Sequence, residues 1–262
     1  MEIYEYRKMY GLEDRLWWYR GLRLYFQAAL RRANLPSDGA VLDAGCGTGA
    51  NLVLLSRMFG RTVGCDLAER AVALSTERGL KRVLVADVNH LPFKNGVFDC
   101  VLCSDVLECG EVDERLAVAE LARVTRTGAR IILSAAAYEF LMSEHDRAVH
   151  AVRRYTKRRL QRAVSVAGVE IVAMRYLFGF FLVPIVTYRL LRRLRRRGKG
   201  ADRPQSDLFL PPRVVNELLF RFARTEVALL SRLGHLPFGT TLLVEMKRIE
   251  HLEARRSDGR RP

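Results

Sequence analysis

The chain has 262 residues, 49% of them hydrophobic, which excludes a wholly disordered protein and suits one large folded domain. Its five cysteines, at positions 46, 65, 100, 103 and 109, are an odd number, which is typical of reduced thiols. The net charge is +15, and the basic residues cluster in 153–162 and 189–203. Such clustering favours an anionic partner, namely a membrane face, a phosphorylated substrate or a nucleic acid, or else simply gives solvated helix faces.

The N-terminal region is charged and aromatic from its first residues, which is not the pattern of a secretion signal. Together with the reduced thiols, this predicts a cytoplasmic location. Residues 4–34 are predicted to be helical, because Trp17, Trp18, Leu22 and Phe26 are spaced to share one helix face.

Strands and helices are predicted to alternate after a turn at 37–40. Apolar strands are expected near 40–44, 61–66, 82–86, 97–103 and 129–135, and helices near 50–58, 68–78 and 112–125. The sequence "TRTG" at 125–128 is expected to end the last helix before its strand. Repeated strand–helix units with apolar strands predict a parallel sheet that is covered by helices on both faces.

The pattern changes after residue 136, where a basic helix is expected at 156–167 and further strands at 169–176 and 240–248. About 60 residues that a minimal sheet does not need separate these strands. We therefore expect a single domain with an N-terminal helical cap, a core in two pieces, a helical insertion and a flexible tail. The respective ranges are 1–36, 37–176 with 239–249, 177–238 and 250–262.

The sequence "VLDAGCGTGA" at 41–50 predicts a strand, a glycine loop and the start of a helix. Glycines allow tight turns and close ligand approach, and the N–H groups that begin a helix attract polar or anionic groups. Asp66 follows at the distance of a ribose-binding acid, so the loop alone is also compatible with a dinucleotide site. A second acid, Asp87, ends the third strand.

Four motifs in order make the region 41–135 resemble the class I S-adenosylmethionine (SAM)-dependent methyltransferases. They are "VLDAGCGTGA", "VLVADVNHLPF", "FDCVLCSDVLE" and "ARVTRTGARIILS". The resemblance implies a Rossmann-like, doubly wound α/β fold, whose mainly parallel seven-stranded sheet has an antiparallel last strand. It also implies an enzyme of class EC 2.1.1.- with SAM as its cofactor.

The resemblance also assigns roles to residues at the ends of the strands. Asp43 and the glycine loop would hold the methionine part of SAM, Asp66 the ribose hydroxyls and Asp87 the adenine amino group. One position departs from the pattern, because Cys109 stands where many members have histidine. The full set of expected cofactor residues is Asp43, Gly45, Gly47, Gly49, Asp66, Leu67, Asp87, Val88, Ser104, Trp18 and Arg23, the last for the cofactor carboxylate.

The flanking segments resemble methyltransferases associated with surface-glycan and lipid-linked sugar pathways. The segments are "LEDRLWWYRGLR", "SEHDRAVHAVRRYTKRRLQRAVSVAG" and "LPFGTTLLVEMKR". After the fifth strand, His145 is a candidate general base that Asp146 would orient, with His150 nearby. The alternative is that His145 and Asp146 cap a helix. Arg153, Arg154 and Tyr155 are the candidates for binding an acceptor, with the arginines suited to a phosphate or carboxylate.

These features favour methylation of a small or lipid-linked acceptor, at oxygen. Carbon methylation of a quinone-type ring and a non-catalytic, cofactor-binding scaffold are the alternatives. A nucleic-acid substrate is disfavoured, because no separate RNA-binding region and no N-P-P-Y motif are present. No metal site is expected, since Cys100 and Cys103 have no second ligand pair nearby.

Residues 176–188 are uncharged and mostly apolar, and the basic run 189–203 follows them. Thirteen residues are too few for a membrane-spanning helix, which needs about 20. The pattern favours a peripheral anchor on an anionic membrane face, such as the inner face of the cell membrane. A lid over the acceptor pocket and a homodimer contact are the alternatives.

Overall fold

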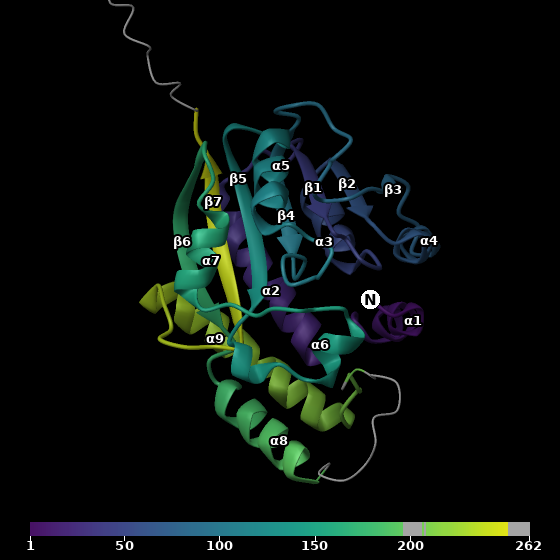
Figure 1. Ribbon diagram of the computed structural model, residues 1–262, viewed down its shortest axis with the longest axis vertical. Coiled ribbons are helices and arrows are strands. Elements are labelled where there is room, and N and C mark those ends of the chain that lie inside the picture. Colours follow the sequence, from purple (N-terminus) through teal and green to yellow (C-terminus); the bar gives the residue numbers. More distant parts are fainter. Residues whose placement is uncertain (196–205, 207, 251–262) are drawn as a thin grey trace, which may run out of the picture.

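A computed structural model describes residues 1–195, 206 and 208–250. Its centre is a seven-stranded sheet in the order β3-β2-β1-β4-β5-β7-β6 (Figure 1). The strands are β1 (Ala40–Ala44), β2 (Arg61–Asp66), β3 (Val83–Val85), β4 (Phe98–Ser104), β5 (Thr125–Ala136), β6 (Val169–Leu177) and β7 (Thr241–Arg248). β7 runs antiparallel to both of its neighbours, whereas β1 to β5 are parallel. This is the predicted mainly parallel, doubly wound α/β fold.

Helices cover the sheet on both faces, with α5 and α7 in front of it and α2 behind it in Figure 1. The helices of the first half are α1 (Ile3–Leu12), α2 (Trp17–Ala33), α3 (Ala50–Met58), α4 (Glu69–Glu77) and α5 (Glu114–Val124). Those of the second half are α6 (Glu144–Ala148), α7 (Lys157–Val164), α8 (Leu182–Arg195) and α9 (Arg213–Leu233). A short 3-10 turn, η1, spans Glu139–Leu141.

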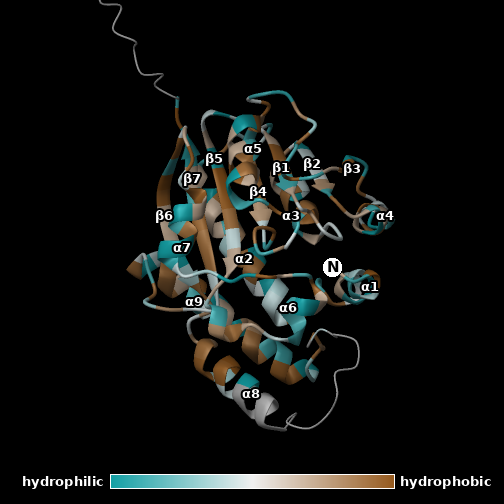
Figure 2. Cartoon of the chain, viewed as in Figure 1, coloured by the Kyte–Doolittle hydropathy of each residue, from teal (hydrophilic) through white to brown (hydrophobic). Residues whose placement is uncertain are grey.

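The core lies between the sheet and these helices. All five residues of β1 are buried, as are most of β4 and β7. Figure 2 shows the strands in brown and the solvent-facing helix α7 largely in teal. Strands buried on both faces explain why the sequence shows continuous apolar runs here instead of alternation.

The predicted helix over residues 4–34 is wrong in one respect, because the chain breaks between α1 and α2. Glu13 lies in this break and is buried, where its carboxylate accepts hydrogen bonds from Thr48 and Arg78. The start of α2 is fixed from far along the chain, since the Trp17 N–H donates to Asn216 Oδ1 at 2.9 Å. The break therefore results from tertiary contacts that helical periodicity does not report.

The predicted end of a helix at 125–128 is also wrong, since β5 already begins at Thr125. Gly128 has φ of +84°, and the pairing register of β4 with β5 shifts between Phe98 and Cys100. The glycine thus lies in an irregular stretch of the strand. The helix α5 itself begins at a clear signal, because the Asp113 side chain accepts hydrogen bonds from two N–H groups of its first turn.

The insertion before β7 consists of the helices α8 and α9, as expected. α9 packs against α2, and the carboxylate of Glu226 is fully buried between them. This carboxylate accepts hydrogen bonds from the N–H groups of Gly179 and Phe180 and from the Tyr25 hydroxyl. The predicted tail and most of the basic run, including Arg196, lie outside the described residues.

Candidate functional site

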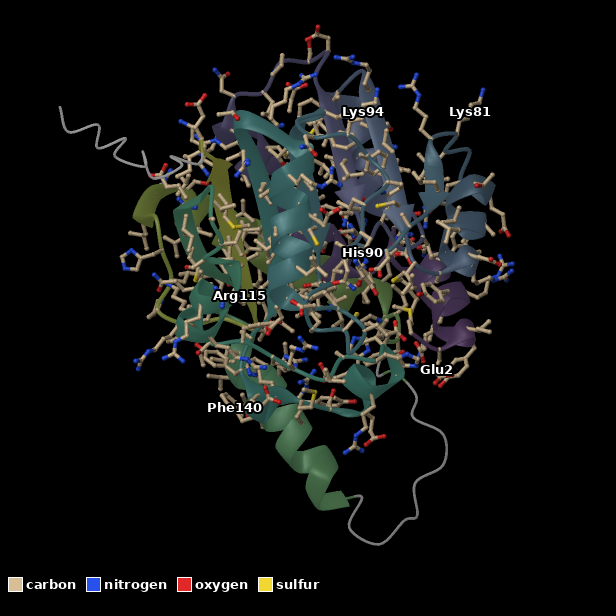
Figure 3. All side chains as sticks on the ribbon, turned by 45° about the horizontal axis from the view of Figure 1, so that its top comes forward. Glu2, Lys81, His90, Lys94, Arg115 and Phe140 are labelled. Carbon is tan, nitrogen blue, oxygen red and sulfur yellow. The ribbon has the colours of Figure 1, made fainter. Side chains whose placement is uncertain are left out.

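A cavity of about 920 Å³ lies at the carboxyl ends of the parallel strands, which is where open α/β sheets bind their ligands. Its walls come from the glycine loop, the ends of β2 and β4, the break between α1 and α2, and the insertion. Figure 3 shows Lys81 and Lys94 at one end of the molecule and Glu2 and Phe140 toward the other end. The expected cofactor residues on its wall are Gly45, Gly47, Asp66, Leu67, Asp87, Val88, Ser104, Trp18 and Arg23.

The glycine loop has a backbone conformation that residues with a side chain rarely adopt. Gly45, Gly47 and Gly49 all have positive φ, of +76°, +54° and +89°. A Cβ on Gly45 would lie 2.3 Å from Cγ2 of Val106, so the loop packs directly against the turn after β4. Gly49 does not line the cavity but caps the N-terminus of α3.

Asp66 holds the glycine loop in place while it faces the cavity. Its Oδ2 accepts a hydrogen bond from the Gly47 N–H at 2.9 Å, and its Oδ1 accepts one from the Ala68 N–H at 3.0 Å. Burial raises the pKa of this carboxyl above its usual value. Each carboxylate oxygen has a further lone pair, so the group can also accept from ligand hydroxyls.

Asp87 and Val88 follow β3 on the next part of the wall. Asp87 Oδ1 accepts from the Asn89 N–H at 2.8 Å, which fixes the turn and leaves Oδ2 near the exposed ring of His90. Val88 is buried beside it. A carboxylate beside a buried apolar side chain is suited to a ring that carries an amino group.

Asp43 is placed differently from the other two acids, because it is wholly buried and does not line the cavity. Neither of its oxygens has a hydrogen-bond partner. Burial, with the neighbouring charges of Asp66 and Glu13, raises the pKa of Asp43 to about 8. The free protein therefore holds a largely protonated carboxyl beneath the loop at neutral pH.

Two expected cofactor residues come from α2. Arg23 donates to the Glu13 carbonyl oxygen at 2.6 Å, and burial lowers the pKa of its guanidinium. Trp18 stacks on Phe178 with a centroid distance of 5.9 Å. The arginine is a partly desolvated cation on the cavity wall, which suits a ligand carboxylate.

The expected His145–Asp146 pair is not present, because Asp146 is engaged elsewhere. Asp146 Oδ1 accepts from Arg154 Nε at 2.8 Å, and Asp146 Oδ2 accepts from the Ser143 N–H at 2.7 Å. The second contact is part of a capping box at the start of α6. Asp146 therefore caps a helix and neutralises a buried arginine, which matches the alternative reading of this motif.

His145 and His150 both line the cavity but differ in environment. His145 Nδ1 is buried without a hydrogen-bond partner, and burial lowers the pKa of its imidazole to about 4. His150 is exposed, has φ of +59°, and places Nε2 3.1 Å from a carboxylate oxygen of Glu2. His145 is thus a neutral imidazole at pH 7.

Of the three expected acceptor residues, the structure places only Arg154 on the cavity wall. Arg153 donates to the carbonyl oxygens of Val112 and Cys109, both at 3.2 Å. Tyr155 is fully buried, and its hydroxyl donates to the Leu107 carbonyl oxygen at 2.9 Å. Both side chains therefore bind carbonyl oxygens of the segment after β4 and do not line the cavity.

Glu108 is a site residue that sequence reasoning missed. It is only 4% exposed, and it lines the cavity beside Ser104 and Asp105. Its Oε1 accepts from the Ala136 N–H at 3.1 Å, whereas Oε2 is buried without a partner. The one available signal was an acid at the end of an apolar strand motif, "FDCVLCSDVLE".

The opposite wall of the cavity is apolar and comes mainly from the insertion. α8 contributes one face to it, and the segment before α9 and the first turns of α9 contribute the rest. The side chains on this wall are Phe181, Pro184, Ile185, Tyr188, Leu208, Phe209, Pro211, Pro212, Val215 and Leu219.

Three further observations concern metal ligands, thiols and membrane-spanning helices. Among the residues that the structure describes, no three His, Cys, Asp or Glu side chains are grouped as a metal site requires. All five cysteines are free, and the thiols of Cys100 and Cys103 are buried within β4. In the described part of the chain, no helix has the length and apolar character needed to cross a bilayer.

Comparison with known proteins identifies the part of the chain that carries the loop and the acids. Residues 42–133 match the family described as "Methyltransferase domain". A tRNA (carboxymethyluridine(34)-5-O)-methyltransferase of Arabidopsis thaliana is 33% identical over 108 residues, which are 40% of this chain and 26% of that protein. The demethylmenaquinone methyltransferase of Thermobifida fusca is 34% identical over 118 residues, which are 42% of this chain and 49% of that protein.

Solved structures share the fold over much more of the chain. A Haloferax volcanii methyltransferase, solved with the Trm112 activator, has a TM-score of 0.60 at 21% identity and aligns over 94% of this chain and 95% of its own. Geranyl diphosphate C-methyltransferase from Streptomyces coelicolor has a TM-score of 0.56 at 17% identity, over 85% and 78%. The match to these two curated relatives spans between about a quarter and a half of their length. Residues 42–133, which carry the glycine loop, Asp66 and Asp87, thus form a methyltransferase domain of the class I SAM-dependent type, for which the cofactor is S-adenosyl-L-methionine.

Proposed function

We propose that this chain transfers the methyl group of SAM to an oxygen atom of a small amphipathic or lipid-linked acceptor. The observation that carries the proposal is one cavity with two different ends. The glycine loop, Asp66 and Asp87 form a polar end, and the insertion forms an apolar end. A volume of about 920 Å³ is near the top of the roughly 300–1,000 Å³ range of ligand pockets, which leaves room for a cofactor and a second molecule.

SAM fits the polar end by the chemistry of the residues present. Asp66 would accept from the ribose hydroxyls and Asp87 from the adenine amino group, with Val88 against the ring. Arg23 would pair with the methionine carboxylate, and the glycine loop would admit the methionine chain to bare backbone. Bound in this way, SAM supplies an electrophilic methyl group on a positively charged sulfur.

The apolar wall favours an acceptor with a chain or ring that avoids water. Its side chains, such as Ile185, Phe209 and Leu219, offer no hydrogen bonds, so burial of apolar surface would drive binding there. The polar groups at the junction of the two ends, His145 and Arg154, would fix the reacting group. Proximity of the two reactants in one cavity supplies much of the rate of such a transfer.

Curated relatives act on different atoms, so the acceptor atom is part of the proposal. They include a demethylmenaquinone methyltransferase, a probable tocopherol O-methyltransferase and a malonyl-[acyl-carrier protein] O-methyltransferase. Methylation of a quinone-type ring carbon is the second candidate, and the apolar wall is equally compatible with it. A scaffold that binds SAM without turnover is the non-enzymatic alternative.

Transfer of label from [methyl-¹⁴C]SAM into extracts of the source cells tests the proposal. We expect label in the organic-solvent extract with the native chain and much less with Asp66→Ala, at a SAM concentration below the dissociation constant of the variant. Mass spectrometry of the labelled product would distinguish a methyl ether from a ring-methylated quinone. Label in the aqueous extract alone would contradict the amphipathic acceptor, and SAM binding without any labelled product would favour the scaffold.

We also propose that α8 serves as a lid, because one of its faces lines the cavity. Its other face exposes Val183, whose side chain is 68% exposed, so a peripheral contact with an anionic membrane would use that face. Changing Arg192, Arg193, Arg195 and Arg196 to Gln separates the two roles. Salt-sensitive sedimentation of the native chain with anionic liposomes, lost in this variant, would support the membrane anchor. If the native chain does not sediment with the liposomes, the lid is the role that remains for α8.

A further inference from the structure

Glu108 lines the cavity, and one oxygen of its buried carboxyl has no hydrogen-bond partner. Its side chain is 4% exposed, Oε1 accepts from the Ala136 N–H, and Oε2 is buried without a partner. A buried polar atom without a hydrogen bond lowers the stability of the folded chain. Because Glu108 lines the cavity, a ligand group bound there could supply the missing partner.

The turn that carries Glu108 lies against the loop that would hold the methionine part of SAM. Val106, two residues earlier, is so close to Gly45 that a Cβ there would lie 2.3 Å from Val106 Cγ2. Ser104 and Asp105, at the end of β4, line the same stretch of wall. Glu108 therefore stands between the cofactor loop and the acceptor end of the cavity, where methyl transfer would occur.

We propose that the Glu108 carboxyl faces the sulfonium group of SAM and is ionised when SAM binds, so that the bound donor prepares the proton acceptor of the reaction. The inference rests on the proposed function, because it requires SAM in this cavity. It goes beyond that function in naming the base and in stating when the base is charged.

The charges around Glu108 agree with a neutral carboxyl in the free protein. Burial and the neighbouring Asp105 raise the pKa of Glu108 to about 8, and the lowering effect of Arg154 is smaller. Arg154 is itself paired with Asp146. Three further groups feel the charge of Glu108, namely Cys103, Cys109 and Tyr155, and they are uncharged at pH 7 because burial raises the pKa of each.

The sulfonium group of SAM would bring a positive charge to this neutral carboxyl. An opposite charge within about 4–6 Å favours the ionised form and lowers the pKa of a carboxyl by about 1–3 units. In the transfer, the acceptor oxygen forms a bond to the methyl carbon, and the carbon–sulfur bond breaks with its electron pair on sulfur. The hydroxyl proton passes to the Glu108 carboxylate. One cation and one anion thus become a neutral thioether and a neutral carboxylic acid.

Calorimetric titration with SAM and with S-adenosylhomocysteine (SAH) between pH 6 and 9 tests the inference without any acceptor. SAH lacks the sulfonium charge and keeps the rest of the cofactor, so the effects of groups that respond to the shared part of the cofactor cancel in the ratio of the two dissociation constants. Because SAM lowers the pKa of Glu108, its binding releases a proton, and its affinity rises with pH until about pH 8. The affinity of SAM relative to SAH should increase roughly tenfold for each unit by which the pKa falls.

Glu108→Gln should make this ratio independent of pH, since the amide oxygen still accepts from the Ala136 N–H but carries no proton to release. Glu114→Gln is the matched control, because Glu114 lies outside the cavity, and it should keep the native pH dependence. Titrations in phosphate and in Tris measure the released proton directly in the native chain, without relying on either variant.

A native ratio that stays flat, with both ligands bound, would overturn the role of Glu108 and leave the proposed function intact. A pH dependence that persists in Glu108→Gln would assign the proton to another group and also overturn the inference. Failure of the native chain to bind either ligand would instead contradict the proposed function itself.

Discussion

The cavity has two ends, the proposed cofactor end at the glycine loop and the proposed acceptor end at α6, α8 and the start of α9. They differ in how their polar side chains are held. At the cofactor end, Asp66 and Asp87 accept hydrogen bonds from backbone N–H groups two residues away, and Asp66 also accepts one from the adjacent glycine loop. At the acceptor end, Asp146 is bound by Arg154, eight residues further along. The first arrangement is local and occurs at the ends of several strands. The second depends on the path of the segment between β5 and α7, which brings Arg154 back to Asp146.

This difference explains why the family motifs cover only residues 42–133. A strand end with a glycine or an acid has nearly the same geometry wherever the sheet occurs. The acceptor end is built from α6, α8 and the start of α9, and these can vary without disturbing the sheet. Function in such folds is therefore specified by the variable segments.

The largest effect that tests this contrast is expected from the buried ion pair at the acceptor end. Asp146→Ala leaves the Arg154 guanidinium buried without its carboxylate, which should lower the free energy of unfolding by about 3–5 kcal/mol. Arg147→Ala is the matched control on the same helix, because its pair with Glu144 is exposed, and it should cost less than about 1 kcal/mol. Equal urea-unfolding midpoints for the two variants would show that Asp146 has no structural role.

A smaller effect is expected from His145 as a function of pH. Its pKa of about 4 in the folded chain lies below the usual 6.5, so the unfolded state binds more protons between these values. Stability should therefore fall as the pH drops from about 6.5 through 4, by roughly 1–3 kcal/mol. His145→Gln should remove this part of the pH dependence.

NMR titration of the imidazole checks the same point independently. A resonance of His145 that stays in its neutral form at pH 5.5 is expected. An imidazole that titrates near pH 6.5 would contradict the buried environment, and it would restore the histidine as a candidate base with an ordinary pKa.

The smallest effect is expected at the lid, from two substitutions on opposite faces of α8. The Ile185 side chain faces the cavity, and the Val183 side chain faces solvent. Each is replaced by Ser. With SAH bound, Ile185→Ser should weaken binding of 4-nonylphenol, an amphipathic probe, by about 1 kcal/mol or a fewfold, because apolar contact area is lost. The change at Val183 should leave the affinity of the probe unchanged, and equal weakening by both would argue against a lid.

Much of the fold followed from the sequence, because its signals are local. The strands from β1 to β4 and the helices α3 to α5 were predicted within two residues, since apolar runs and glycine loops determine them. The break between α1 and α2 was missed because Glu13 is held by Thr48 and Arg78, far along the chain. Periodicity alone does not contain that information.

The residues of the candidate site also fall into two groups, those with a local sequence signal and those whose placement depends on distant contacts. The strand-end acids were found because each ends an apolar run, whereas His145 and Asp146 were paired only because they are adjacent in sequence. Glu108 was overlooked because its placement depends on the Ala136 N–H, which approaches it only in the folded sheet. Residues whose function depends on distant contacts require the structure.

The most direct test of the account is the affinity of SAH for the native chain and for Asp66→Ala, measured by calorimetry at one pH. Removal of the carboxylate would leave two ribose hydroxyls without their acceptor and free the Gly47 N–H from its partner. We expect the dissociation constant to rise by a factor that corresponds to about 1–3 kcal/mol, in a variant whose melting curve shows that it is folded. An unchanged dissociation constant in the folded variant would contradict the assignment of this cavity to SAM.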